Sequence, residues 1–276
     1  MSREVTMDRK CALVTGGSRG IGRGIAVVLA RSGYDLAITY ATASEEAEQT
    51  AAQVRAAGGR CFICQATLEA DGVPEAVVSQ AIGELGRLDL LVNNAGLTRF
   101  ATLDKLDCSL MDFVYRLNWR APMLCTQAAA RHMLDHQIQG SIINIASTRG
   151  IRAYGNDHLY GAMKAALIRS SESLALELSG YGIRVNVIAP GATLVRGDIS
   201  RETAAQTGWA HKIPLGRYGT PEEVGHAVAY LASDQAAYIT GAVLKMDGGL
   251  ILPGMPEDPS PEAGYGWARP KKPVSG

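Results

Sequence analysis

The chain has 276 residues, 47% of them apolar, and carries 27 basic and 27 acidic side chains. This length allows one large core or two small ones, and the balanced charge gives no electrostatic footprint for nucleic acid. No apolar run approaches the roughly 20 residues of a membrane span, and the first ten residues lack the apolar stretch of a signal peptide, so we expect a cytoplasmic protein without membrane or nucleic-acid partners.

Short apolar runs alternate with helical stretches along most of the chain. The apolar runs begin near Lys10, Asp35, Arg60, Leu88, Ser141, Ile183 and Ala242. Helices are expected over residues 20–31, 44–57, 72–85, 108–136, 158–178 and 221–232. This alternation predicts an α/β fold, a Rossmann-like doubly wound parallel sheet of about seven strands with helices on both faces. No linker divides the pattern, so residues 1–250 are expected to form a single domain.

A glycine-rich turn, Gly16-Gly-Ser-Arg-Gly20-Ile-Gly22, follows the first predicted strand and opens the first helix. Glycines let the backbone approach a pyrophosphate, and the free N–H groups of a helix N-terminus attract it. The turn therefore predicts a dinucleotide-phosphate site. It also contains Gly-x-Ser18-x-Gly, the pattern of a serine-hydrolase elbow. We disfavour that alternative because an elbow normally follows several strands and no Asp–His pair stands out at later strand ends.

The cysteines and two of the histidines raise the question of redox or metal chemistry. Cys61 and Cys64 form a Cys-x-x-Cys pattern within the third predicted strand, where positions three apart point to opposite faces. We interpret them as packing cysteines, and the odd total of five argues against a disulfide framework. His132 and His136 share a helix face, but no third ligand stands nearby at a recognisable spacing. No metal site is predicted.

Tyr160 and Lys164 stand four residues apart in the fifth predicted helix, so their side chains share one face. A nearby ammonium favours phenolate and lowers the pKa of a tyrosine from its usual value of roughly 10. Such a tyrosine can exchange a proton with a carbonyl or an alcohol. Taken alone, the pair is equally compatible with packing or with a surface contact.

Together these motifs resemble the short-chain dehydrogenase/reductase family over about residues 10–249. The shared motifs are Thr15-Gly-x-x-x-Gly-x-Gly22, Asn93-Asn-Ala-Gly96, Asn118, Ser147, Tyr160-x-x-x-Lys164, Pro190-Gly191 and Asp247-Gly-Gly249. The resemblance implies an NAD(P)(H)-dependent oxidoreductase that reduces a ketone or oxidises a secondary alcohol by direct hydride transfer. The chain is similar both to 3-oxoacyl-acyl-carrier-protein reductases and to the glucose dehydrogenase branch. An oxoacyl compound and a sugar or polyol both remain open as substrates.

The resemblance also implies roles for individual residues. Tyr160 would transfer the proton, Ser147 would hold the substrate oxygen, and Lys164 would tune Tyr160 and grip the nicotinamide ribose. Asn118 would support a water that relays protons, although a helix contact for Asn118 and a strand-end cap for Ser147 are alternatives. The nucleotide would contact Gly16, Ser18, Arg19, Gly20, Ile21, Gly22, Tyr40, Thr67, Leu68, Asn94, Ala95, Gly96, Tyr160, Lys164, Pro190, Gly191 and Thr193. Candidate substrate-pocket residues are Thr98, Arg149, Tyr154, Asn156, His158 and Trp209.

The end of the second strand favours NADP(H) over NAD(H), although NAD(H) remains possible. An NAD enzyme usually places a carboxylate there for the ribose 2′-hydroxyl, whereas this strand ends in Tyr40 and its only acid, Asp35, lies at the opposite end. Arg19 in the glycine turn would attract a 2′-phosphate. Thr67 and Leu68 replace the family's usual Asp-Val beside adenine, so we expect that contact to change. Thr193 supplies a hydroxyl two positions earlier than the family pattern.

Two segments depart from the alternating pattern. Residues 193–215 have few strand signals, and the resemblance implies a substrate lid there. Residues 251–276 hold six of the eleven prolines, which prevents a regular helix or central strand. Either a disordered end or an arm with Tyr265 and Trp267 packed on a neighbouring subunit is compatible with this composition.

The helices that carry Asn118 and Tyr160 are apolar around more of their circumference than a surface helix requires. The resemblance implies that they pair across a two-fold axis in a homotetramer. A catalytically silent dinucleotide-binding regulator is the main alternative to an enzyme. The presence of Ser147, Tyr160 and Lys164 together argues against it.

Overall fold

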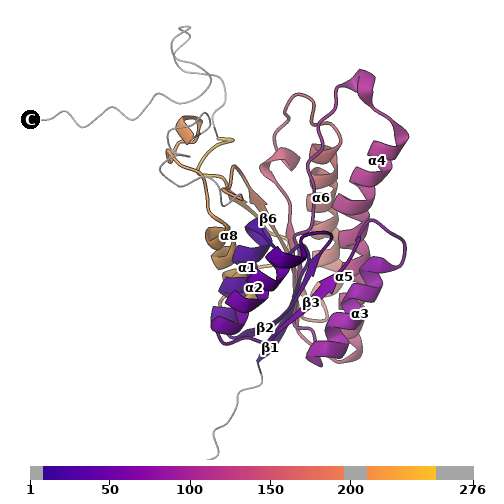
Figure 1. The fold of residues 1–276 in the computed structure, drawn as a ribbon, viewed down its shortest axis with the longest axis vertical. Coiled ribbons are helices and arrows are strands. Elements are labelled where there is room, and N and C mark those ends of the chain that lie inside the picture. Colours follow the sequence, from indigo (N-terminus) through magenta and orange to yellow (C-terminus); the bar gives the residue numbers. More distant parts are fainter. Residues whose placement is uncertain (1–8, 196–209, 253–276) are drawn as a thin grey trace, which may run out of the picture.

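The computed structural model describes residues 9–195 and 210–252, in which a central sheet lies between two layers of helices (Figure 1). The sheet has the strand order β3-β2-β1-β4-β5-β6-β7, and each neighbouring pair is parallel. The strands are β1 (Lys10–Val14), β2 (Tyr34–Tyr40), β3 (Cys61–Gln65), β4 (Leu90–Asn93), β5 (Ser141–Ile145), β6 (Arg184–Pro190) and β7 (Val243–Met246). The predicted doubly wound parallel sheet is confirmed.

Helices cover both faces of the sheet (Figure 1). One layer holds α1 (Gly20–Arg31), α2 (Ser44–Ala56) and α8 (Pro221–Ala232), and the other holds α3 (Val73–Leu85), α4 (Cys108–Tyr115), α5 (Ala121–Asp135) and α6 (Tyr160–Ser179). Short helical turns are η1 (Leu103–Lys105), η3 (Thr148–Gly150), η4 (Ala210–Lys212) and η5 (Asp234–Ala236). A buried apolar cluster fills the space on each face of the sheet, as a sheet buried on both sides requires. Within the described ranges no helix is both long and apolar enough to span a bilayer.

The helix predicted over residues 108–136 is interrupted by a π-helical turn, η2 (Arg116–Arg120). Asn118 Nδ2 donates to the carbonyl of Val114 at 3.1 Å, the group that would accept from Asn118 N in an α-helix. Pro122, one turn later, has no N–H to return to Asn118 O. The ladder therefore shifts by one residue. Such π-bulges are frequent at functional sites.

The chain turns in opposite directions from the centre of the sheet, because β1 pairs with β2 on one side and with β4 on the other. In open α/β sheets, ligands bind in the crevice at the carboxyl ends of the strands where the order reverses. The loops after β1 and β4 meet there. These loops carry the predicted glycine turn and the Asn94–Gly96 segment.

A buried chain of polar side chains ties α6 to the middle of the sheet. Asn93 Nδ2 donates to Asn144 Oδ1 at 2.8 Å, and Asn144 Nδ2 donates to Ser171 Oγ at 2.8 Å. Ser171 in turn donates to the carbonyl of Leu167. Because buried polar groups are costly unless paired, this chain fixes the position of α6 relative to β4 and β5.

The Cys-x-x-Cys pair faces two different layers. Cys64 belongs to the core beneath α3 and α5, whereas Cys61 packs against the core beneath α1 and α8. Burial raises the pKa of Cys61 to about 12 and raises the pKa of Cys64 as well. Both thiols are therefore kept in the unreactive protonated form, which supports the interpretation as packing residues. The predicted tail arm, including Tyr265 and Trp267, lies outside the described residues.

Candidate active site

The glycine turn forms an open cradle at the N-terminus of α1. Gly16 has a φ of +63°, and Gly22 approaches it so closely that a Cβ on Gly22 would lie 2.1 Å from the carbonyl oxygen of Gly16. Arg19 is the N-cap residue, and its side chain makes no capping hydrogen bond. The first N–H groups of α1 are thus available to an anion, and the missing Cβ on Gly22 lets the turn fold tightly against Gly16. The cradle fits a dinucleotide pyrophosphate.

The segment after β4 is hydrogen-bonded directly to this cradle. Asn94 Nδ2 donates to the carbonyls of Thr15 at 2.9 Å and Gly16 at 3.0 Å. The backbone N–H groups of Asn94 and Ala95 both donate to Thr15 Oγ1 at 3.0 Å. The predicted nucleotide residues at these two strand ends therefore form one rigid surface.

The structure brings the predicted catalytic residues together at the same edge of the sheet. The Lys164 ammonium lies 5.7 Å from the centre of the Tyr160 ring, as the four-residue spacing predicts. A Cβ placed on Gly96 would lie 2.8 Å from Asn118 Oδ1 and 3.3 Å from Lys164 Nζ. The glycine at this position therefore leaves room for both side chains beside the end of β4.

Asn118 is fully buried and holds the segment after Gly96. Its Oδ1 accepts from Leu97 N at 3.1 Å, and its Nδ2 donates to Leu97 O at 3.2 Å. These bonds occupy the amide in a structural contact. Asn118 thus holds the backbone next to Lys164, which agrees with the helix-contact alternative for this residue.

Tyr160 differs from the sequence expectation in its acidity. Burial raises the pKa of Tyr160 above its ordinary value, although hydrogen bonds with Thr98 and Ser147 act in the opposite direction. The prediction that the lysine lowers this pKa is therefore wrong for the structure described. The reason is that desolvation destabilises the phenolate more than its hydrogen-bonding neighbours stabilise it. A tyrosine held as the neutral phenol is in the form that donates a proton to a carbonyl.

Lys164 is buried, and its ammonium donates to the carbonyl of Ile145 at 2.8 Å. Burial lowers the pKa of Lys164 from 10.5 to about 8. A lysine with that pKa changes charge close to physiological pH, which is typical of catalytic sites. The residue is thus costly to bury and poised to exchange a proton.

Ser147 lies in the turn between β5 and α6. Its Oγ accepts from Arg149 N at 3.2 Å, so it caps the short helix η3 as well as contacting Tyr160. The capping bond of Ser147 therefore does not prevent its hydroxyl from contacting Tyr160, so the two interpretations of this residue are compatible. Among the other candidate pocket residues, Thr98 reaches Tyr160, whereas Trp209 lies outside the described residues.

The remaining predicted nucleotide residues follow the carboxyl ends of the outer strands. Thr67 is exposed after β3, whereas Leu68 is buried in the core beneath α3. Gly191 N donates to Met246 O at 2.9 Å, and Thr193 forms a bridge with Gly219. Of the predicted lid, residues 196–209 lie outside the described part of the chain.

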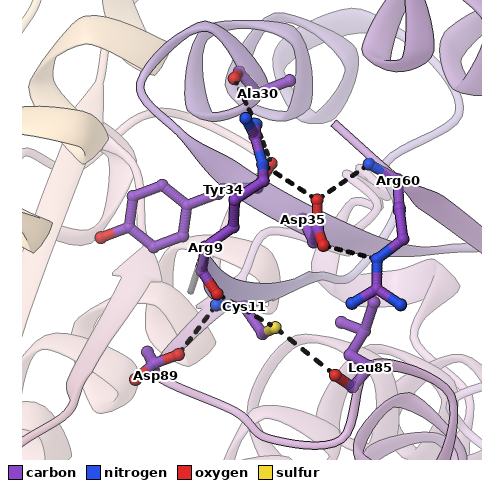
Figure 2. Close-up of polar contacts among 8 residues, drawn as sticks. All are labelled: Arg9, Cys11, Ala30, Tyr34, Asp35, Arg60, Leu85 and Asp89. Carbon is purple, nitrogen blue, oxygen red and sulfur yellow. Dashed lines mark hydrogen bonds and ion pairs between the residues drawn. The ribbon is translucent and has the colours of Figure 1, made fainter. Parts of the chain in front are cut away.

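Asp35, the acidic residue of β2, forms its ion pairs at the amino edge of the sheet, far from the carboxyl edge that carries the site. Asp35 is buried at the start of β2, where it bonds Arg9 Nε at 3.0 Å and Arg60 Nε at 2.6 Å (Figure 2). Burial alone would raise the pKa of Asp35, but the hydrogen bonds and the charge of Arg60 lower that pKa below its ordinary value. As predicted from its place in the strand, Asp35 lies at the opposite end of β2 from Tyr40 and is not available to a nucleotide ribose.

A carboxylate that the sequence pattern does not indicate stands beside Arg19. Arg19 Nη1 lies 3.5 Å from Glu46 Oε2, and the Arg19 side chain is 67% exposed. Glu46 comes from the first turn of α2, so no spacing rule relates it to the glycine turn. The arginine remains available to an incoming phosphate, with Glu46 as a competing partner.

The hydrolase alternative does not fit the position of Ser18. The residue is only 6% exposed, and its carbonyl accepts from Arg23 Nη2 at 2.9 Å and Thr50 Oγ1 at 2.7 Å. A nucleophile must present its hydroxyl to substrate. Ser18 instead anchors the glycine turn to α2.

Comparison with known proteins finds relatives among reductases. A family model described as Enoyl-(Acyl carrier protein) reductase matches residues 16–251. The 3-oxoacyl-acyl-carrier-protein reductase FabG of Staphylococcus aureus is 39% identical over 246 residues, covering 88% of this chain and 98% of the relative. A 3-oxoacyl-acyl-carrier-protein reductase of Synechocystis is 38% identical over 249 residues, covering 89% and 98% respectively.

Solved structures give the same picture. Acetoin dehydrogenase YohF from Salmonella typhimurium superposes with a TM-score of 0.83 at 33% identity, covering 88% of this chain and 96% of that one. A short-chain dehydrogenase/reductase from Serratia marcescens gives a TM-score of 0.80 at 38% identity, covering 87% and 97%. The likeness extends over nearly the whole length of each relative.

Proposed function

The chain belongs to the short-chain dehydrogenase/reductase family, and from that premise we propose an oxidoreductase that interconverts a ketone and a secondary alcohol and prefers NADP(H). The observation that carries the proposal is the meeting of Ser147, Tyr160 and Lys164 beside the glycine cradle. Position at the carboxyl edge of the sheet adds support, because dinucleotides bind there in this architecture.

Each group of residues has a definite task in this proposal. The open N-terminus of α1 and the turn from Gly16 to Gly22 would hold the pyrophosphate, and Lys164 would hold the nicotinamide ribose. When bound, the nicotinamide would supply or accept the hydride. Ser147 orients the substrate oxygen, and Tyr160 gives that oxygen a proton in reduction or takes it in oxidation. The neutral phenol is the form that donates the proton in reduction.

The substrate class is proposed from the names of the relatives. Two relatives are named 3-oxoacyl-acyl-carrier-protein reductases, and one structural neighbour is an acetoin dehydrogenase. We therefore expect turnover of 3-oxoacyl thioesters or small ketones with NADPH, with polyols as the second class to assay. A spectrophotometric screen of these classes with NADPH and NADH tests the proposal. Binding of NADPH without turnover of any carbonyl or alcohol would instead identify a silent dinucleotide-binding protein.

The cofactor preference depends on Arg19. We expect Arg19→Ala to weaken NADPH binding by about 10- to 100-fold, the range for loss of a hydrogen bond to a charged group. NADH, which lacks the 2′-phosphate, should lose little affinity. Fluorescence titration of both nucleotides measures the difference. Glu46→Gln is the matched control, because removal of the competing carboxylate should leave NADPH affinity equal or higher. Equal losses for NADPH and NADH in Arg19→Ala would contradict the preference.

We also propose a homotetramer in which the helical segment that carries Asn118 (α4, η2 and α5) and α6 pair across a two-fold axis. Apolar side chains on these helices are exposed in the single chain, including Leu176 at 81% and Met111 at 46%. Burial of such groups favours association. Light scattering should give the mass of four chains of 29.2 kDa each. A monomer mass would contradict the assembly, and Leu176→Asp should shift the distribution toward smaller species.

A further inference from the structure

An ion pair with a buried carboxylate joins the segment after Ser147 to the segment before Tyr160. Arg149 Nη1 bonds Asp157 Oδ2 at 2.9 Å, and the Asp157 side chain is only 2% exposed. Asp157 Oδ1 is buried and has no hydrogen-bond partner among the described residues. Because burying a charge is costly unless it is paired, this carboxylate depends on the Arg149 guanidinium.

The pair joins the two segments that carry the reacting side chains. Arg149 N donates to Ser147 Oγ at 3.2 Å, and Asp157 O accepts from Gly161 N at 3.1 Å in the first turn of α6. A Cβ on Gly161 would lie 2.9 Å from Arg149 O and 3.4 Å from Asp157 Oδ2. The ion pair therefore joins the two ends of the loop that runs from Ser147 to Tyr160.

Arg149 also contacts the segment that follows β4 through cation–π interactions. Its guanidinium lies 4.8 Å from the centre of the Phe100 ring and 4.5 Å from that of Tyr154. Phe100 comes two residues after Thr98, the residue that hydrogen-bonds Tyr160. Cation–π contacts of this kind add stability when the cation is partly desolvated. Three segments around the phenol thus converge on one arginine.

We propose that the Arg149–Asp157 ion pair is a positioning element of the catalytic centre, which joins the loop of Ser147 to the first turn of α6 and imposes two opposed charges on the Tyr160 phenol. Neither residue needs to contact substrate in this role. The inference deepens the proposed function and rests on it, because it concerns the acid–base group of that same site.

The two charges act on Tyr160 in opposite senses. The Asp157 carboxylate raises the pKa of Tyr160 and the Arg149 guanidinium lowers it, both less strongly than burial raises it. Among the described residues, the other groups that face the phenol are Lys164 from α6, the Ser147 hydroxyl from the loop after β5 and the Thr98 hydroxyl from the segment after β4. Removal of one member of the pair therefore leaves the other uncompensated.

Titration of the phenol in two single variants tests this proposal. Asp157→Asn keeps the shape of the side chain and should lower the pKa of Tyr160, whereas Arg149→Gln should raise it. The ultraviolet absorbance of phenolate reports this ionisation, and each variant is read against the same variant carrying Tyr160→Phe. Reduction needs the protonated phenol, so the alkaline limb of kcat should move to lower pH in Asp157→Asn and to higher pH in Arg149→Gln.

Controls separate this role from a purely structural one. Arg149→Lys restores the charge and should return the titration toward wild type, and Asp234→Asn removes an exposed carboxylate near the amino ends of the strands and should not move it. Circular dichroism at each pH establishes that the variants are folded. Folded variants that shift in the same direction, or not at all, would overturn the proposal. Since the titration needs neither substrate nor nucleotide, it remains readable if the proposed function fails.

Discussion

Tyr160→Phe is expected to reduce turnover by about 100- to 10,000-fold, the usual contribution of a positioned general acid, while NADPH still binds. The substitution removes one oxygen from a partly buried ring and leaves the packing of α6 unchanged. The phenol contacts Ser147 and Thr98, so its loss removes the proton donor and not the cradle that holds the nucleotide. Steady-state assays and nucleotide titration measure the two effects separately.

A second tyrosine provides the matched control. Tyr181→Phe removes the same atom from an exposed ring just after α6 and should leave turnover and binding unchanged. Turnover in Tyr160→Phe comparable with that of Tyr181→Phe would contradict the acid–base assignment. Loss of NADPH binding in Tyr160→Phe alone would assign the tyrosine to the nucleotide site instead.

Lys164→Met should destroy turnover and yet make the protein more stable near neutral pH. The fall in the pKa of Lys164 from 10.5 to about 8 on burial corresponds to about 3 kcal/mol of destabilisation. Loss of the hydrogen bond to Ile145 O subtracts about 1 kcal/mol, which leaves a net gain of about 2 kcal/mol for the apolar replacement. Denaturant unfolding of the nucleotide-free protein measures it.

The gain should depend on pH in a definite direction. Below about pH 8 the lysine is charged in both the folded and the unfolded chain, so the folded state carries the full desolvation cost. As pH rises from about 8 to 10.5, only the unfolded chain binds the proton, so the wild type becomes more stable and the advantage of Lys164→Met disappears.

Lys105→Met, at an exposed lysine in η1, should show no such pH dependence. A Lys164→Met protein that is less stable than wild type near neutral pH would contradict the predicted cost of burying the ammonium. Unchanged turnover in that variant would remove Lys164 from the catalytic set. The two readouts therefore test the burial and the function of the same side chain independently.

Local patterns in the sequence were sufficient for most of the fold. Short apolar runs separated by helical stretches predict parallel strands with crossover helices, because a strand buried on both faces must be apolar throughout. The one helical error, the continuous helix over 108–136, came from side-chain bonding by Asn118 and the missing N–H of Pro122. Both residues are visible in the sequence, but their effect depends on which carbonyl the asparagine reaches.

The site was predictable to the extent that its chemistry follows fixed spacing. Tyr160 and Lys164 share a helix face whatever the rest of the chain does, and the glycines of the turn after β1 permit a close approach of any anion. In contrast, Glu46 and Asp157 were not identified, because each reaches its arginine across a turn or between two helices. No periodicity in the sequence records such contacts.

The succession of strands and helices, the cradle beside α1 and the alignment of Tyr160 with Lys164 depend on residues close together in the chain, so local sequence is enough to predict them. The strength with which each group holds its proton depends instead on how the chain packs. Burial raises the pKa of Tyr160 and lowers that of Lys164, and segments distant in sequence set how far each side chain is buried.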